Sequence, residues 1–105
     1  MKLRIRGQSL RLRATAEEVR ELAARGRIES QIRLSVDRAL VYRVATVPEG
    51  PRLAVDFRGD VIEVRVAEPA AREWCDSDLV TLAGTQHSGE VEVRIVLEKD
   101  FDSSD

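Results

Sequence analysis

Residues 3–28, LRIRGQSLRLRATAEEVRELAARGRI, recur 52 positions later as residues 55–80, VDFRGDVIEVRVAEPAAREWCDSDLV. Each copy reads as a strand, a Gly turn, a second strand, a helix and the start of a third strand. Few residues are identical, but apolar positions coincide, among them Leu12 with Val64, Leu22 with Trp74 and Ile28 with Val80. This pattern predicts an internal repeat of two ββαββ units.

Alternation of apolar and charged residues marks the first two strands. Leu3 and Ile5 share one face of the strand 2–6, with basic residues on the other face, which is the period of a half-buried strand. Gly7 begins a tight turn into the strand 10–13, which repeats the pattern. The first unit therefore begins with a hairpin that has one apolar face and one arginine-rich face.

Capping signals locate the first helix. Thr15 stands three residues before Glu18, so that a hydroxyl and a carboxylate can satisfy the free amides of a helix start. The helix predicted over 16–25 ends at Gly26, since glycine tolerates the left-handed conformation of a C-terminal cap.

A Pro- and Gly-rich segment, residues 48–51, separates the two units. Before it, strands are predicted around 28–34 and over 39–47, the latter apolar on both faces and therefore central. After it, we predict strands over 53–58 and 61–66, a helix over 69–75, and strands over 79–83 and 90–98 joined by a loop over 84–89. We expect one α+β domain, 1–105, with pseudo-repeat units at about 2–47 and 53–98, mostly antiparallel strands in a curved sheet or partial barrel, two helices, and an acidic tail over 99–105.

Composition limits the class of protein. The chain has 105 residues, 43% apolar and 34% charged, which suffices for one buried core. No apolar run approaches the roughly 18 residues of a membrane span, and the first residues alternate charge with aliphatics where a signal peptide needs a continuous apolar stretch. We therefore expect a cytoplasmic protein with no membrane partner. The single cysteine, Cys75, excludes an intramolecular disulfide.

Charge is divided unevenly between the two halves. The net charge is only −2, yet residues 1–47 carry eleven basic and five acidic residues, while residues 48–105 carry six basic and fourteen acidic ones. Such halves can attract each other within a monomer, can pair between the protomers of a homodimer or with another protein, or can leave a basic face for an anionic ligand.

Two segments resemble a known family. MKLRIRGQSLRLRATAEEVRELAARGRIE, residues 1–29, and VRIVLEKDF, residues 93–101, are similar to a family of small uncharacterised bacterial proteins that begin with the same arrangement of strand, Gly turn and strand. The resemblance implies a cytosolic bacterial domain of unknown activity, and it carries over no catalytic residues. Members that resemble this chain continue into a Cys-containing acidic tail, which the segment 102–105 does not match.

The sequence contains no pattern typical of a catalytic, metal or cofactor site. His87 is the only histidine and falls in a predicted loop, while Cys75 falls on the predicted core face of the second helix, so we expect no nucleophilic pair. Asp76 and Asp78 lack the loop pattern of a dedicated calcium site. We therefore predict no catalytic residue, no metal site and no cofactor, and we favour a protein that is not an enzyme.

The outward-facing arginines are the candidate site for a partner or an anion: Arg4, Arg6, Arg11, Arg13 and Arg33. The leading interpretation is a non-catalytic binding or protein-interaction module. The alternative is a phosphohydrolase or an anion-binding protein for nucleotide, polyphosphate or nucleic acid. A barrel with this face inward would resemble the triphosphate tunnel enzymes, but the segment 90–94 departs from their Glu-x-Glu-x-Lys strand. Tyr42, Phe57 and Trp74 are predicted in the core, which leaves none of them to stack on bases.

Overall fold

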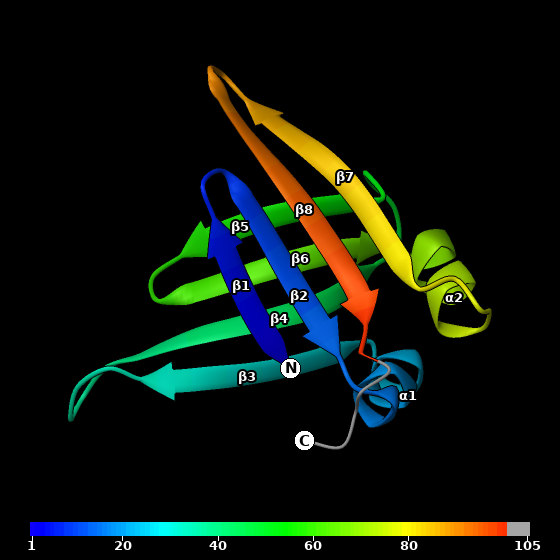
Figure 1. Ribbon diagram of the computed structural model, residues 1–105, viewed down its shortest axis with the longest axis horizontal. Helices are drawn as coiled ribbons and strands as arrows, with labels where there is room; N and C mark the ends of the chain where they lie inside the picture. The colour runs from blue at the N-terminus through cyan, green and yellow to red at the C-terminus, as the bar shows by residue number, and fades with distance from the viewer. Residues whose placement is uncertain (101–105) are drawn as a thin grey trace.

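The computed structural model describes residues 1–100 as an α+β fold of two helices and eight strands (Figure 1). In chain order the elements are β1 (Lys2–Arg6), β2 (Ser9–Ala14), α1 (Ala16–Arg25), β3 (Arg27–Arg33), β4 (Ala39–Val47), β5 (Leu53–Arg58), β6 (Val61–Ala67), α2 (Glu68–Cys75), β7 (Thr81–Ser88) and β8 (Val91–Lys99). The predicted α+β class and the ββαββ order of each half are confirmed.

The strands form two four-stranded mixed sheets, and no closed barrel is present among the described residues. Sheet A has the order β1-β2-β8-β7, and sheet B has the order β3-β4-β6-β5. Each sheet joins two antiparallel hairpins, one from each unit, through a central parallel pair, β2 with β8 or β4 with β6. The two units are therefore interleaved, since each contributes one hairpin to each sheet.

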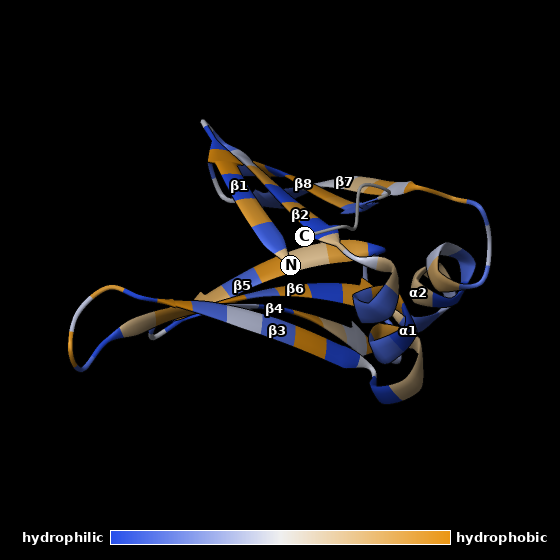
Figure 2. Cartoon of the chain, turned by 60° about the horizontal axis from the view of Figure 1, so that its bottom comes forward, coloured by the Kyte–Doolittle hydropathy of each residue, from blue (hydrophilic) through white to orange (hydrophobic). Residues whose placement is uncertain are grey.

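Figure 2 shows the two sheets as separate layers, with both helices at one end and the hairpin connections toward the other. The sheets diverge toward the hairpin connections. Along one side β5 packs beside β7, which brings an edge of sheet B against an edge of sheet A. The molecule is thus closed at the helical end and along the β5–β7 side.

The hairpins β1–β2 and β5–β6 share one register. Leu3 pairs with Leu12 in the first hairpin, and Val55 pairs with Val64 in the second. Gly7 and Gly59 turn the two hairpins with φ values of 55° and 58°, in the left-handed region that glycine enters without a steric penalty. This agreement makes each residue of one hairpin a structural counterpart of a residue in the other.

The correspondence shifts in the later strands. Leu12 pairs with Leu97 and Val64 pairs with Val44, so Val44 is the counterpart of Leu97. Their antiparallel partners, Ile28 and Leu82, are consequently counterparts too. The predicted match of Ile28 with Val80 is wrong. The reason is a difference in the connections between helix and strand, because one residue, Gly26, joins α1 to β3, whereas five, 76–80, join α2 to β7.

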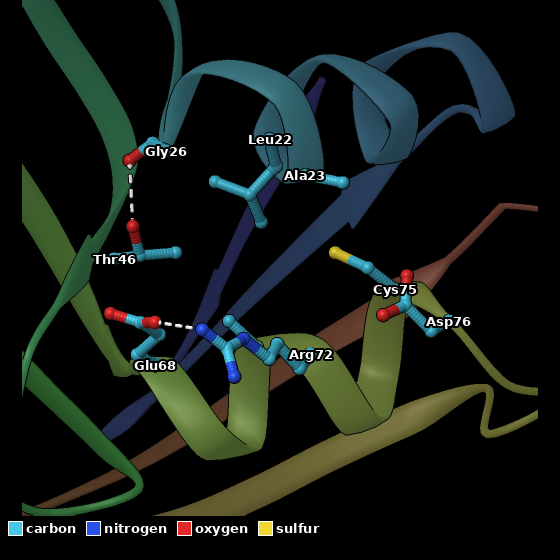
Figure 3. Close-up of a pocket in the computed structure, with 9 residues that line it drawn as sticks. Leu22, Ala23, Gly26, Thr46, Glu68, Arg72, Cys75 and Asp76 are labelled. Carbon is cyan, nitrogen blue, oxygen red and sulfur yellow. Dashed lines mark hydrogen bonds and ion pairs between the residues drawn. The ribbon is translucent and has the colours of Figure 1, made fainter.

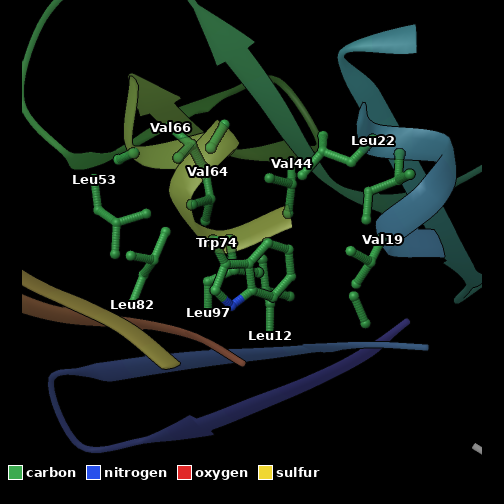
Figure 4. Close-up of a cluster of buried hydrophobic side chains, with 14 of the residues drawn as sticks. Leu12, Val19, Leu22, Val44, Leu53, Val64, Val66, Trp74, Leu82 and Leu97 are labelled. Atoms are coloured by element: carbon green, nitrogen blue, oxygen red, sulfur yellow. The ribbon is translucent and has the colours of Figure 1, made fainter. Parts of the chain in front are cut away.

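Both helices close the core (Figure 4). The Thr15 hydroxyl accepts from the Glu18 amide while the Glu18 carboxylate accepts from the Thr15 amide, and this confirms the capping box. Gly26 caps the other end of α1 at φ 75°. Leu22 from α1 and Trp74 from α2 are fully buried, and the Trp74 indole donates to the Val80 carbonyl at 2.9 Å. The aliphatic partners in the core come from both sheets: Leu12, Val44, Leu53, Val64, Val66, Leu82 and Leu97.

Three local predictions require correction. The loop predicted over 84–89 is part of β7, because Gln86 and its neighbours pair with β8 and only Gly89 and Glu90 form the turn. Phe57 lies on the inner face of sheet B but is 67% exposed, since it stands beyond the closed part of the core. Of the predicted acidic tail, Lys99 belongs to β8 and Asp100 is buried, while 101–105 lie outside the described residues.

Candidate functional site

A basic surface covers the outer side of sheet A. The β1–β2 ladder sets Lys2 opposite Arg13 and Arg4 opposite Arg11. Side chains of like charge directly opposite each other on antiparallel strands repel. Arg94 of β8 is on the same side, next to Ser9 of β2. We call this surface the basic face, and it comprises Lys2, Arg4, Arg6, Arg11, Arg13 and Arg94.

Among residues 1–100, acidic side chains pair with some cations of the basic face but not with Arg4 or Arg6. The Glu98 carboxylate lies 2.5 Å from Arg13 Nε and 3.5 Å from Arg11 Nη1, so one acid serves two arginines. Asp100 lies 3.4 Å from Lys2 Nζ. Within residues 1–100, Arg4 and Arg6 make no ion pair. Lys2, Arg4, Arg11 and Arg13 line a hollow of about 200 Å³, so these cations surround a concave spot.

The outer side of sheet B carries the same kind of residue in a paired arrangement. Arg43 contacts Glu29 at 3.4 Å and Glu63 at 3.3 Å. Arg65 contacts Glu63 at 2.7 Å and Asp56 at 3.4 Å. The alternating series is completed at its ends, where Arg27 contacts Glu29 and Arg58 contacts Asp56. Each acid of this series lies between two arginines.

The charge state of sheet B reflects this pairing. The hydrogen bond from Arg65 lowers the pKa of Glu63, and the nearby Arg43 guanidinium adds to that effect. The same hydrogen bond raises the pKa of Arg65. Both groups therefore stay charged through the neutral range, and their charges offset each other.

Counterpart positions show where the two faces differ. Arg6 and Arg13 of sheet A correspond to Arg58 and Arg65 of sheet B, as the common hairpin register requires. The pair between these two positions differs in the sign of its charges. Sheet A has Arg4 opposite Arg11, and sheet B has Asp56 opposite Glu63. The same scaffold thus has one face with offsetting charges and one face with excess positive charge.

Four of the five predicted site residues, Arg4, Arg6, Arg11 and Arg13, come together on the basic face. Arg33 does not join them, because it belongs to β3 of sheet B and its guanidinium donates to the Val36 carbonyl in the β3–β4 connection. Arg94 was not predicted as part of the site. Only the parallel pairing of β8 with β2 brings Arg94 there, and no local sequence signal reports that pairing.

Exposed apolar residues gather at the hairpin ends. The large hydrophobic side chains that are most exposed among residues 1–100 are Ile5, Ile32, Leu34, Val36, Phe57 and Val91. Each lies at or next to a connection between paired strands, opposite the helical end of the molecule (Figure 2).

A crevice of about 290 Å³ separates the two helices (Figure 3). Cys75 lines it and points its thiol at the Val19 carbonyl, 3.8 Å away. Burial raises the pKa of this thiol, and the neighbouring Asp76 carboxylate raises it further. A thiol held in its neutral form is a poor nucleophile. The one ion pair across the mouth, Glu68 with Arg72, joins successive turns of α2.

His87 lies elsewhere, on β7, with Nδ1 3.6 Å from Glu92. Among residues 1–100 no group of three His, Cys, Asp or Glu side chains is placed to hold a metal ion. Neither helix is long and apolar enough to cross a membrane.

The model of a family described only as a family of unknown function, DUF7009, matches residues 1–105. The chain belongs to this family. The resemblance found in the N-terminal strands and the C-terminal segment is thereby extended to the whole sequence. No curated protein and no solved structure matches the chain.

Proposed function

We propose that the protein is a binding module that holds an acidic protein partner on the basic face of sheet A. The observation that carries this proposal is the Arg4–Arg11 pair, at the positions where sheet B has Asp56 and Glu63. Four cations in cross-strand register repel one another unless acids neutralise them. Glu98 and Asp100 supply some of that charge. The partner supplies an acid for Arg4, which makes no ion pair within residues 1–100.

An acidic protein fits this surface better than a nucleic acid does. Binders of single-stranded nucleic acid combine a basic groove with aromatic side chains on which bases stack. Tyr42 and Phe57 lie on inner faces and Trp74 is buried, so none of them reaches the basic face.

A phosphate-bearing ligand is the second candidate. The observation in its favour is the hollow lined by Lys2, Arg4, Arg11 and Arg13, because guanidinium groups around one point can hold phosphate oxygens by paired hydrogen bonds. Its test is the comparison of three probes in one assay: poly-L-glutamate, inorganic polyphosphate and oligo-deoxythymidine. Tighter binding of the last two would favour this candidate over an acidic protein.

A double variant on each sheet tests the main proposal. Arg4→Ser/Arg11→Ser removes the cross-strand pair of the basic face. Arg58→Ser/Arg65→Ser removes the same number of charges from the paired face of sheet B, at the edge strand and its neighbour. We expect poly-L-glutamate to bind the native protein at low salt, to be lost in the first variant and to be kept in the second. Equal loss in both variants, or no binding at low salt, would contradict the proposal.

Salt provides an independent measurement. Binding between exposed charges weakens as the Debye length falls from about 10 Å at 0.1 M salt to about 3 Å at 1 M. We expect the affinity for poly-L-glutamate to fall steeply over that range. An affinity that does not change with salt would show that charge is not what the face recognises.

We also propose a cytoplasmic location, in agreement with a single free thiol whose pKa is raised by burial. Fractionation of cells that produce the native protein tests it. Recovery with the membrane or secreted fraction would overturn the assignment.

A further inference from the structure

The outer edge of β1 is an open strand edge. β1 pairs only with β2 in sheet A, and the strand is exposed over most of its length. Beyond that ladder, the backbone of residues 3–6 makes no hydrogen bond to any of residues 1–100. The nearest contact is at the start of the strand, where the Tyr42 hydroxyl donates to the Met1 carbonyl at 3.2 Å. An unpaired edge of this kind is a template for another strand.

The counterpart edge, on β5, is sealed. The side-chain amide of Gln86 accepts from the Val55 amide at 2.8 Å and donates to the Val55 carbonyl at 3.0 Å. One side chain thereby replaces a neighbouring strand at that residue. β5 is an edge strand of sheet B, the sheet whose outer charges are paired.

The residue that could seal β1 in the same way is absent. Leu3 is the counterpart of Val55, since both hairpins share one register. Gln86 pairs with Val93, and Ile32 pairs with Leu40, at corresponding places in the β7–β8 and β3–β4 hairpins. β3 does not pack along β1 as β7 packs along β5, and Ile32, the counterpart of Gln86 in its hairpin, has an aliphatic side chain that cannot form a hydrogen bond. It is left 50% exposed.

The two sides of β1 differ in chemistry. Lys2, Arg4 and Arg6 point to the outer face, as their pairing with outward residues of β2 requires. Leu3 and Ile5 point to the inner face, where Leu3 packs against the core and Ile5 is 59% exposed. A strand placed beside β1 meets basic side chains on one face and apolar side chains on the other, at alternate positions.

We propose that the partner docks as an extended segment that adds a strand to the free edge of β1, with acidic residues at alternate positions and apolar residues between them. This inference rests on the proposed function, and it specifies the form in which the acidic partner binds. Its acidic residues complement Lys2, Arg4 and Arg6, and its apolar residues cover Ile5. Main-chain hydrogen bonds supply affinity, and the alternation supplies specificity, as in other cases of strand addition.

A second copy of the chain is a poorer occupant of the same edge. Antiparallel pairing of two β1 strands would set the basic residues of one copy against those of the other, because Lys2, Arg4 and Arg6 all share one face. Like charges on an edge strand are a common means of preventing such self-association.

The experiment compares two capped peptides of about eight residues, within the usual length of a strand. One alternates Glu with Val; the other has the same composition with its Glu and Val residues in two blocks. Both are used at concentrations where each peptide is monomeric by sedimentation. We expect the alternating peptide to bind at least about tenfold more tightly, because only its register satisfies both faces and the edge. Backbone N-methylation at every second residue of the alternating peptide removes the amides along one of its two edges. The tighter binding should be lost when the methylated edge is the one that pairs with β1.

A substitution on each half supplies the matched control. Ile5→Ser removes the exposed apolar side chain of β1 that the Val residues of the peptide cover, and it should lower affinity for the alternating peptide at least about tenfold while leaving binding of poly-L-glutamate unchanged. Gln86→Ile alters only the β5 edge and should leave binding of the alternating peptide unchanged. Hydrogen exchange in the bound complex should slow at amides within residues 3–6.

The outcomes separate this inference from the proposed function. If both peptides bind equally and Arg4→Ser/Arg11→Ser abolishes binding of each, the basic face binds acids but strand addition is wrong. If Arg4→Ser/Arg11→Ser leaves binding intact, the proposed function itself is wrong. Self-association of the native protein that Ile5→Ser abolishes would overturn the inference in favour of a second copy at this edge.

Discussion

Replacing Arg4 by Asp should stabilise the protein while it weakens partner binding. Arg4 has no acidic partner within residues 1–100 and lies directly across from Arg11. Arg4→Asp removes a like-charge pair and places an opposite-charge pair at that point of the ladder. Cross-strand pairs contribute about 0.2–1 kcal/mol each, with the low end expected for exposed groups, so the two changes together should add about 0.5–1 kcal/mol to the free energy of unfolding.

Thermal and urea denaturation measure this gain. For a domain of this size, about 1 kcal/mol corresponds to a shift of about 4–8 °C, so we expect the midpoint to rise by about 2–6 °C at low salt. The gain should largely disappear at about 1 M salt, where the Debye length is about 3 Å. Arg4→Ser, which relieves the repulsion without adding a pair, should give a smaller increase.

The reverse charge change at the counterpart position of sheet B serves as the control. Asp56→Arg puts a cation at the counterpart position and deprives Arg58 and Arg65 of their shared partner, so stability should fall. A gain for Arg4→Asp that persists at high salt, or no gain at all, would refute the argument that the basic face is electrostatically strained. An unchanged affinity of Arg4→Asp for poly-L-glutamate would refute its link to binding.

The core and the first helix give further predictions. Trp74→Ala should lower the free energy of unfolding by about 3–5 kcal/mol, because the indole is fully buried and its loss leaves a cavity. Phe57→Ala should lower it far less, since Phe57 is 67% exposed. Urea denaturation of both variants measures the difference. Thr15→Ala should cost about 1 kcal/mol through the lost cap, and a cost near zero would show that the capping box contributes nothing. Burial alone would raise the pKa of Glu18, but hydrogen bonds from the N-terminal ammonium and from Thr15 outweigh it, so the folded pKa is lowered. The corresponding stabilisation is present above the ordinary glutamate pKa of about 4.3 and is lost as the pH falls through the lowered pKa of the folded state. Unfolding measured over a range of pH should show this loss in the native protein and not in Glu18→Gln.

The elements of the fold were predictable because their signals are local. Gly7 and Gly59 mark the hairpins, and Thr15, Glu18 and Gly26 mark the ends of α1. The pairing of β2 with β8 was not predictable, because parallel neighbours far apart in sequence have no turn between them to fix their register. The wrong match of Ile28 with Val80 has a related origin, since the longer connection between α2 and β7 moves the strand along the chain without any local signal.

The candidate site was predictable only within one hairpin. Alternation placed Arg4, Arg6, Arg11 and Arg13 on a common face, and their cross-strand register confirms that placement. The contact that links the charged pairs of the two sheet B hairpins could not be predicted, because Arg43 reaches Glu63 across the parallel pair. The open edge of β1 was equally hidden, since it depends on how the two sheets pack, which brings β7 beside β5 but does not bring β3 beside β1 in the same way.

The interleaving of the two units has a consequence for synthesis and for engineering. When only the first half of the chain has been made, β2 and β4 still lack β8 and β6, so two strand edges that end up in the middle of sheets are temporarily open. Such intermediates are prone to wrong pairings and aggregation. A chain cut between residues 48 and 52 should accordingly yield two fragments that fold only on mixing, because each fragment holds half of both sheets and a complete version of neither.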